Sequence, residues 1–294
     1  MNTTDFPGIQ QAADEASIRS QQTYINIVRA NLICGVIGAL IAVYNFEQVE
    51  PKVIVYIISL TLLVSSLSLT IAVKHYRLED LWYQGRALAE SIKTLTWRYV
   101  TCSDNFESTL PQTEVQTNFN DSITSLSRLF PDLTTYMKIE LLNRNVISPQ
   151  MNSMRLTTWQ TRLNNYLTHR IQDQIDWYTS KATFNSKKRK NWLSVIILSQ
   201  AISVLSCAWL VFFPTTAWNL VGLLTTLSAS AIGWLQLKQH QSLVQAYATA
   251  SVELTQIKSL SNTISDEQKF TEFVLDSENA ISREHTTWLA QRRK

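Results

Sequence analysis

The sequence is poor in the residues that most enzyme motifs require. Six glycines among 294 residues form no glycine-rich loop for a phosphate group, and no P-loop, GxSxG or HExxH motif occurs. The three cysteines and four histidines are scattered along the chain, without the spacing of a zinc site. Glu284 and His285 adjoin, but no second metal ligand follows them. We therefore expect no enzymatic activity, no metal and no cofactor.

Charged residues are absent from three long stretches, residues 30–46, 53–73 and 191–237. A membrane-spanning helix needs about 20 predominantly apolar residues. The third stretch is long enough for two such helices, with a turn at Pro214. A buried soluble helix is an alternative for any one segment, but it does not explain four segments in two closely spaced pairs. The sequence predicts an all-α polytopic membrane protein with four spans in two helical hairpins, 27–46 with 53–73 and 192–213 with 217–237.

Lysine and arginine lie at one end of each predicted hairpin. Arg29, Lys74, Lys238 and the basic run 187–190 flank the spans, whereas the two connecting turns contain Lys52 as their one cation. Under the positive-inside rule, both hairpins enter and leave from the cytoplasmic side. We expect a multi-pass protein with both termini in the cytoplasm.

An internal repeat relates the two hairpins. A shift of 165 positions lays the second hairpin on the first without gaps, in the same orientation, and the similarity continues into the helix that follows each hairpin. The predicted organisation is a first unit at 1–100 with a cytosolic helix at 74–99, a Ser/Thr/Asn-rich connector at 101–148 with short helices at 113–129 and 133–144, and a second unit at 149–294 with a stalk at 149–190 and cytosolic helices at 239–262 and 266–292.

Local signals place the ends and faces of the cytosolic helices. Ser148 before Pro149 is a typical N-cap and first-turn pair. No breaker follows Pro149, so we expect one helix to run from there into the third span. The acidic residues of the last helix, Asp276, Glu278 and Glu284, are expected to form a solvated face.

Hydroxyl and small residues take the place of charges inside the spans. Missing intramembrane charges disfavour a transporter. Two interpretations of the small polar residues stay open, since they either let helices approach closely or form the wall of a polar pore. Candidate pore-lining residues are Thr61, Ser65, Ser68, Thr226 and Ser230, and candidate helix-packing residues are Gly35, Gly38, Ala39, Ala42, Ala229 and Gly233.

Three cytosolic stretches carry a family resemblance. RLNNYLTHRIQDQIDWYTSKATFN at 162–185, FVLDSENAISREHTTWLAQRR at 273–293 and WYQGRALAESIKTLTWRY at 82–99 resemble helices of the SLATT family, the SMODS- and SLOG-associating two-transmembrane effector domains of bacteria. The resemblance implies a tandem of two SLATT units in the bacterial inner membrane. The motif residues are Trp82, Arg86, Glu90, Lys93, Arg170, Gln174, Trp177, Tyr178, Lys181, Ser282, Arg283, Glu284 and His285.

Two functions from different classes follow. The resemblance implies an effector of a nucleotide-linked bacterial conflict system, with a nucleotide-signalling or sensor protein as a partner, that forms a pore or perturbs the membrane. The alternative is a membrane-anchored scaffold whose cytosolic helices recruit a protein without conduction. Four spans in one chain can hardly enclose a channel, so conduction requires a homo-oligomer in the lipid bilayer. The modest net charge of +3 does not point to nucleic acid.

Overall fold

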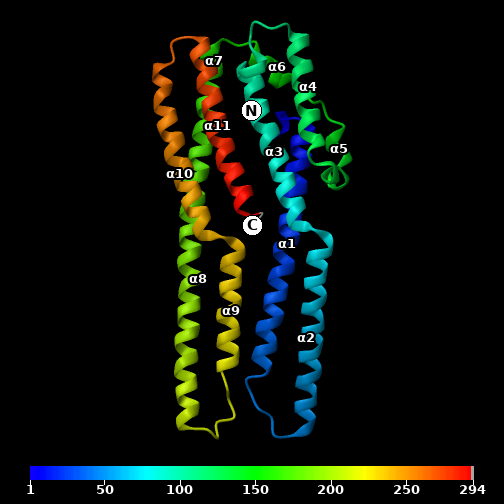
Figure 1. The fold of residues 1–294 in the computed structure, drawn as a ribbon, viewed down its shortest axis with the longest axis vertical. Coiled ribbons are helices and arrows are strands. Elements are labelled where there is room, and N and C mark those ends of the chain that lie inside the picture. Colours follow the sequence, from blue (N-terminus) through cyan, green and yellow to red (C-terminus); the bar gives the residue numbers. More distant parts are fainter. Residues whose placement is uncertain (293–294) are drawn as a thin grey trace. The chain divides into compact units, whose positions relative to one another are not determined.

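The computed structural model describes the backbone of residues 1–292 and the side chains up to Ser282, and the described residues are almost entirely helical (Figure 1). The α-helices are α1 (Gly8–Ile41), α2 (Val49–Tyr76), α3 (Leu78–Thr101), α4 (Gln112–Arg128), α5 (Ile139–Leu142), α6 (Pro149–Arg155), α7 (Trp159–Tyr166), α8 (Asp173–Phe212), α9 (Val221–Lys238), α10 (His240–Ser259) and α11 (Glu267–Arg292). Short 3-10 segments and one π-helix, η4 (Leu167–Gln172), connect them.

The chain divides into two compact units. Unit 1 consists of Met1–Gln21, Glu79–Ala182 and Gln245–Lys294, and unit 2 consists of Gln22–Leu78 and Thr183–Val244. The two longest helices, α1 and α8, contribute residues to both units. Each unit is built from segments that are far apart in the sequence.

Unit 2 contains the two predicted hairpins, α1 with α2 and α8 with α9 (Figure 1). Its helices expose large apolar side chains, among them Leu63 at 68% and Val211 at 72% of their surface. Among the described residues, three helical stretches are long and apolar enough to cross a membrane: Gly8–Ile41, Val49–Thr101 and Trp159–Phe212. These candidate spans indicate a membrane protein. The fourth predicted span corresponds to α9, which has 18 residues and is not among them; it stays a prediction.

The turns of the two hairpins pair with each other within unit 2. Asn45 donates its backbone N–H to the Ala217 carbonyl at 3.1 Å, and Asn219 donates to the Val43 carbonyl at 2.8 Å. The Tyr44 ring lies edge-on to Trp218, with 4.9 Å between the ring centroids. This short bridge pairs backbone groups of the two turns, all of which lie outside the helices.

Unit 1 encloses a core rich in aromatic side chains. Tyr99, Phe106 and Phe119 pack together with ring centroids 4.6–5.9 Å apart. Two of these rings come from 101–148, so this segment contributes to the core through helices such as α4, which lies where a helix was predicted.

The N-terminal part of α1 packs closely against α3. A Cβ added at Gly85 would lie 2.9 Å from the Ala13 carbonyl oxygen and 3.0 Å from the Ser17 side chain. Ser17 donates its hydroxyl to the Trp82 carbonyl at 2.9 Å. Glycine at position 85 therefore permits the close approach of the two helices.

The predicted stalk is wrong in its first part, because the helix that begins at Pro149 is interrupted, whereas an uninterrupted helical stretch does run from Trp159 to Phe212. Ser148 does cap α6, since its hydroxyl accepts the Met151 N–H at 3.2 Å. However, α6 ends at Arg155, and Thr158 caps a new helix, α7, by accepting the Thr161 N–H. Threonine hydroxyls compete with helical backbone bonds in this way. The break lets Arg155 turn inward, where its guanidinium donates to the carbonyls of Tyr99 and Phe106.

Each hairpin ends at a single residue in the left-handed region. Arg77 between α2 and α3 has φ 45°, and Gln239 between α9 and α10 has φ 48°. Both are followed at once by another helix, which supports the internal repeat. The two breaks lie 162 positions apart, so the ungapped shift of 165 does not superpose them.

Candidate functional site

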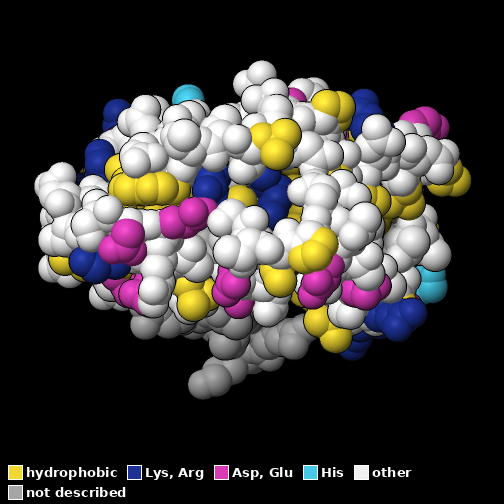
Figure 2. Space-filling model, turned by 90° about the horizontal axis from the view of Figure 1, so that it is seen from above, with side chains coloured by type: hydrophobic (Ala, Val, Ile, Leu, Met, Phe, Trp, Pro, Cys, Tyr) yellow, Lys and Arg dark blue, Asp and Glu magenta, His cyan; other side chains and the backbone are white. Residues whose placement is uncertain are grey.

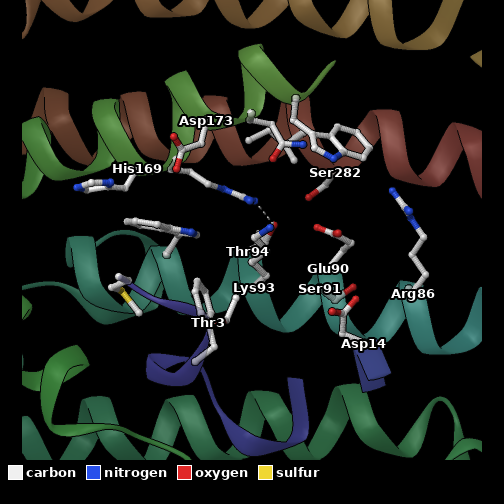
Figure 3. A pocket seen from close by; sticks show the side chains of 18 of the residues that line it. Thr3, Asp14, Arg86, Glu90, Ser91, Lys93, Thr94, His169, Asp173 and Ser282 are labelled. Carbon is white, nitrogen blue, oxygen red and sulfur yellow. Dashed lines mark hydrogen bonds between the residues drawn. The ribbon is translucent and has the colours of Figure 1, made fainter. Parts of the chain in front are cut away.

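A cavity of about 700 Å³ lies within unit 1 (Figure 3). Its polar lining comes from η1 (Thr3–Asp5), α1, α3, η4, α8 and α11, with Thr3, Asp14, Arg86, Glu90, Ser91, Lys93, Thr94, His169, Arg170, Asp173, Gln174 and Ser282. Trp97, Trp177 and Tyr178 are among the aromatic residues of the wall. A volume in this range suits a small-molecule ligand.

The fold brings most of the predicted motif residues together at this cavity. The lining includes Arg86, Glu90, Lys93, Arg170, Gln174, Trp177, Tyr178 and Ser282. Trp82 is buried outside the lining. Lys181 is exposed, and its ammonium lies 5.7 Å from the centre of the Trp177 ring. The side chains of Arg283, Glu284 and His285 lie outside the described residues.

A buried ion pair joins two of the lining elements, η4 and α11. Arg170 donates from Nε to Glu278 Oε1 at 2.8 Å and from Nη2 to Oε2 at 2.7 Å, a bidentate arrangement. Tyr166 and Thr94 also donate to this carboxylate, at 2.9 and 2.8 Å. The Arg170 and Glu278 side chains expose 1% and 0% of their surface. Four hydrogen bonds therefore compensate the buried carboxylate.

This network corrects the prediction that Glu278 belongs to a solvated face. Asp276 is exposed as expected, whereas Glu278 points into the unit. The partner that makes burial possible is 108 positions away, so no local pattern on α11 reveals it. Although burial alone lowers the pKa of Arg170, the adjacent Glu278 carboxylate raises it above its ordinary value. Burial and Glu278 likewise raise the pKa of Tyr166, which keeps its proton.

Burial also shifts the pKa values of two other charged groups in the cavity, Asp14 and Lys93. Burial raises the pKa of the Asp14 carboxyl, and the nearby Glu90 raises it further. Burial lowers the pKa of the Lys93 ammonium, and Arg170 adds to this effect, whereas Glu90 opposes it. In Figure 3, Asp14 lies close to Glu90, with Arg86 beyond them and His169 toward the opposite end of the cavity.

The cavity wall contains N–H donors that have no acceptor within the described residues. Nη1 of Arg170 and Nε1 of Trp97 are among them, and both side chains are almost completely buried. Buried polar groups without a partner are uncommon and costly. The part of the wall around Arg170 and Trp97 is therefore short of hydrogen-bond acceptors.

The predicted pore-lining residues lie in unit 2, apart from this cavity. Thr61, Ser65 and Ser68 are exposed on α2, and each donates its hydroxyl to the carbonyl four residues earlier at 2.8–2.9 Å. Thr226 and Ser230 are half-buried on α9. Their role in a pore stays a prediction about an assembly of several chains.

The predicted packing residues show no close helix approach at their glycines. A Cβ added at Gly35, Gly38 or Gly233 meets no neighbouring atom within 4 Å, and Ala42 and Ala229 are exposed. Ala39 is half-buried. The buried small residues of the α8–α9 hairpin are instead Ser199, Ser203, Ser228 and Ala231. A packing role for the glycines therefore concerns contact with other molecules and stays a prediction.

Sequence reasoning missed two features of the molecule. The first is Asp14, which lines the cavity from α1. The available signal was the group of alanines around it, Ala12, Ala13 and Ala16, which are buried in the structure. The second is Asn31 in the first hairpin, which donates to Thr70 at 3.0 Å and accepts a hydrogen bond from Ser66. An asparagine inside an apolar run was the available signal.

Comparison with protein families gives two matches that together cover most of the chain. Residues 7–163 match SMODS and SLOG-associating 2TM effector domain 3, and residues 166–288 match SMODS and SLOG-associating 2TM effector domain 1. Comparisons with curated proteins and with solved structures give no significant match. The first match includes the segment 101–148, in agreement with its contribution to the core of unit 1.

Proposed function

Because the chain belongs to the SLATT family, as a tandem of two SMODS and SLOG-associating 2TM effector domains, we propose that it is the membrane effector of a bacterial nucleotide-linked conflict system. In this proposal a cytosolic signal reaches unit 1, and unit 2 then forms a pore or perturbs the inner membrane as a homo-oligomer. Both termini are cytoplasmic, and a nucleotide-signalling or sensor protein supplies the signal.

The exposed apolar surface of unit 2 is the observation that carries this proposal. The α2 helix contains no buried residue at all within its described length, although it is among the most apolar parts of the chain. A surface of this kind is stable against lipid or against other apolar helices. Unit 1 has a mixed polar and charged surface, with acidic and basic side chains interspersed over its end face (Figure 2), as suits contact with water.

The hydroxyl face of α2 supports a second candidate function, a membrane-anchored scaffold. Thr61, Ser65 and Ser68 already donate to their own helix backbone. Such back-bonding satisfies a hydroxyl without water, so these residues are compatible with a purely lipid-facing helix. In that case unit 1 recruits a partner protein and unit 2 provides only the anchor.

Membrane permeability distinguishes the two functions. The full-length protein is expressed in bacteria with a membrane-potential dye, and the purified protein is tested for ion flux in liposomes. Replacing Thr61, Ser65 and Ser68 together by leucine should abolish flux while leaving insertion and oligomer size unchanged. The matched control replaces Ile57, Leu60 and Leu67, exposed apolar residues of the same helix, by valine, and flux should persist. Flux that survives the triple leucine change would remove these residues from the path, and wild-type protein without flux under any activating nucleotide would favour the scaffold.

A further inference from the structure

The cavity of unit 1 has the composition of a ligand site rather than of a packing defect. Packing defects in protein interiors are small and apolar, whereas this space of about 700 Å³ is lined by groups of both charges, hydroxyls and aromatic rings. Its polar residues come from six elements of the chain. The ion pair of Arg170 with Glu278 fixes two of these elements against each other.

The unpaired groups of the wall indicate what the ligand must offer. Among the residues whose side chains are described, Arg170 Nη1 and Trp97 Nε1 find no acceptor, and neither group can act as an acceptor itself. Lys93 stands on the same face of α3 as Trp97, four residues earlier, and supplies a partly buried ammonium. Three donors, two of them cationic, suit an anionic group rich in oxygen, such as a phosphate.

Acidic groups lie farther along the cavity, between these donors and Arg86 (Figure 3). Glu90 precedes Trp97 by seven residues on α3, which is about 10 Å along the helix axis at 1.5 Å per residue. Asp14 joins Glu90 there (Figure 3). Two carboxylates are acceptors, and they suit the amino or ring N–H groups of a nucleobase. A polyphosphate is disfavoured because Asp14, Glu90 and Asp173 balance much of the positive charge in the lining.

We propose that this cavity binds a nucleotide with few phosphate groups. Lys93, Arg170 and Trp97 hold the phosphate, Asp14 and Glu90 bind the edge of the base, and the aromatic residues of the wall pack against the ring system. The inference deepens the proposed function and rests on it in one respect, since it gives the effector its own site for the activating signal. The binding itself is a property of unit 1.

Binding is measured by titration calorimetry with the full-length protein in detergent micelles. The probes are AMP, GMP, cyclic di-AMP and cyclic di-GMP, with adenosine and inorganic phosphate as the two halves of the ligand. At least one nucleotide should bind, and adenosine and phosphate should each bind at least about tenfold more weakly. If none of the four nucleotides binds, or if phosphate alone binds as well as they do, the proposal is overturned.

Two conservative variants locate the site. Trp97→Phe keeps the ring but removes the N–H, and Lys93→Met keeps the chain length but removes the charge. Loss of a hydrogen bond to a charged group should weaken binding by about tenfold or more in each variant. Trp82→Phe is the matched control, because Trp82 is a buried tryptophan of the same helix outside the cavity. Its affinity should equal that of the wild type. Affinity unchanged in Trp97→Phe and Lys93→Met, with normal melting, would place the nucleotide elsewhere and overturn the assignment.

The outcome is independent of the flux experiment. Nucleotide binding without ion flux would remove the pore-forming function and leave the ligand site in place. Flux that is triggered without any nucleotide binding to the purified protein would remove the ligand site and leave the pore-forming function in place.

Discussion

Replacing Glu278 by glutamine tests whether the buried ion pair holds the cavity together. Glutamine has nearly the same shape, but it presents one oxygen and one N–H₂ group to four donors that now meet a carboxylate. Arg170 would keep its charge in a site where its side chain exposes 1% of its surface. Removing one partner of a buried ion pair costs about 3–5 kcal/mol.

The effect is large enough for a thermal melt of the detergent-solubilised protein. Domains of roughly 150–250 residues lose about 2–4 °C in midpoint per kcal/mol, so Glu278→Gln should lower the midpoint of unit 1 by about 6–20 °C. Tryptophan fluorescence reports this transition, since Trp97 lies in the core of unit 1. Glu272→Gln is the matched control on the same helix. Glu272 is exposed, and its change should cost at most about 0.5 kcal/mol.

A double variant separates the ion pair from a general loss of packing. Replacing a whole buried ion pair by apolar residues is often neutral or stabilising, so Arg170→Met with Glu278→Met should recover a large part of the stability lost in Glu278→Gln. Equal midpoints for Glu278→Gln and Glu272→Gln would refute the buried pair. Strict additivity of the two single methionine changes would refute it as well, because residues in direct contact should show a coupling energy.

Three further predictions use the helix packing, the titration and the topology. Gly85→Ala should lower the melting midpoint, at a cost of about 1–3 kcal/mol for overpacking, whereas Gly35→Ala, where the added Cβ meets no atom within 4 Å, should not; equal effects would contradict the close approach of α1 and α3. Asp14→Asn should stabilise the protein at pH 7 and lose this advantage as the pH falls toward about 4. The reason is that the pKa of Asp14 is raised in the folded protein, so the protonated carboxyl is buried without penalty at low pH, whereas stability is lost as the pH rises through the pKa of the folded state. A stability difference that does not change with pH would exclude the titration of Asp14 as its cause. In a cysteine-free background, Glu47→Cys should react with an impermeant reagent in intact cells and Asn120→Cys should not, and labelling of the latter would refute the orientation.

Hydropathy and caps made the helices predictable because both act over a few neighbouring residues. The spans needed only their uncharged length, and the N-cap at Ser148 needed only its hydroxyl and the proline after it. The same local logic failed at Thr158, where nothing in the sequence shows which of several threonines will accept a backbone N–H and begin a new helix. Helix ends inside a polar stretch depend on tertiary partners, here the carbonyls that receive Arg155.

The sequence predicted many of the residues of the site, but it did not predict that they line one cavity. The family resemblance selected Arg86, Glu90, Lys93 and Arg170, and the fold brings them to one cavity. It did not supply Glu278, because a carboxylate on an amphipathic helix looks the same whether it meets water or a guanidinium 108 positions away. Burial of a charge is decided by its partner, and the partner is known only once the helices are packed.

The polar groups of the first hairpin divide its surface in two. Asn31 on α1 joins Ser66 and Thr70 on α2, so the polar side chains along this seam find their partners within the hairpin, as a membrane requires. Thr61, Ser65 and Ser68 lie off the seam and remain exposed. Their hydroxyls donate hydrogen bonds to backbone carbonyls, and the oxygen lone pairs can still accept hydrogen bonds from water. A conducting path built from these oxygens needs the same face of several protomers, so any change that keeps the protein monomeric should abolish flux even when the seam and unit 1 are intact.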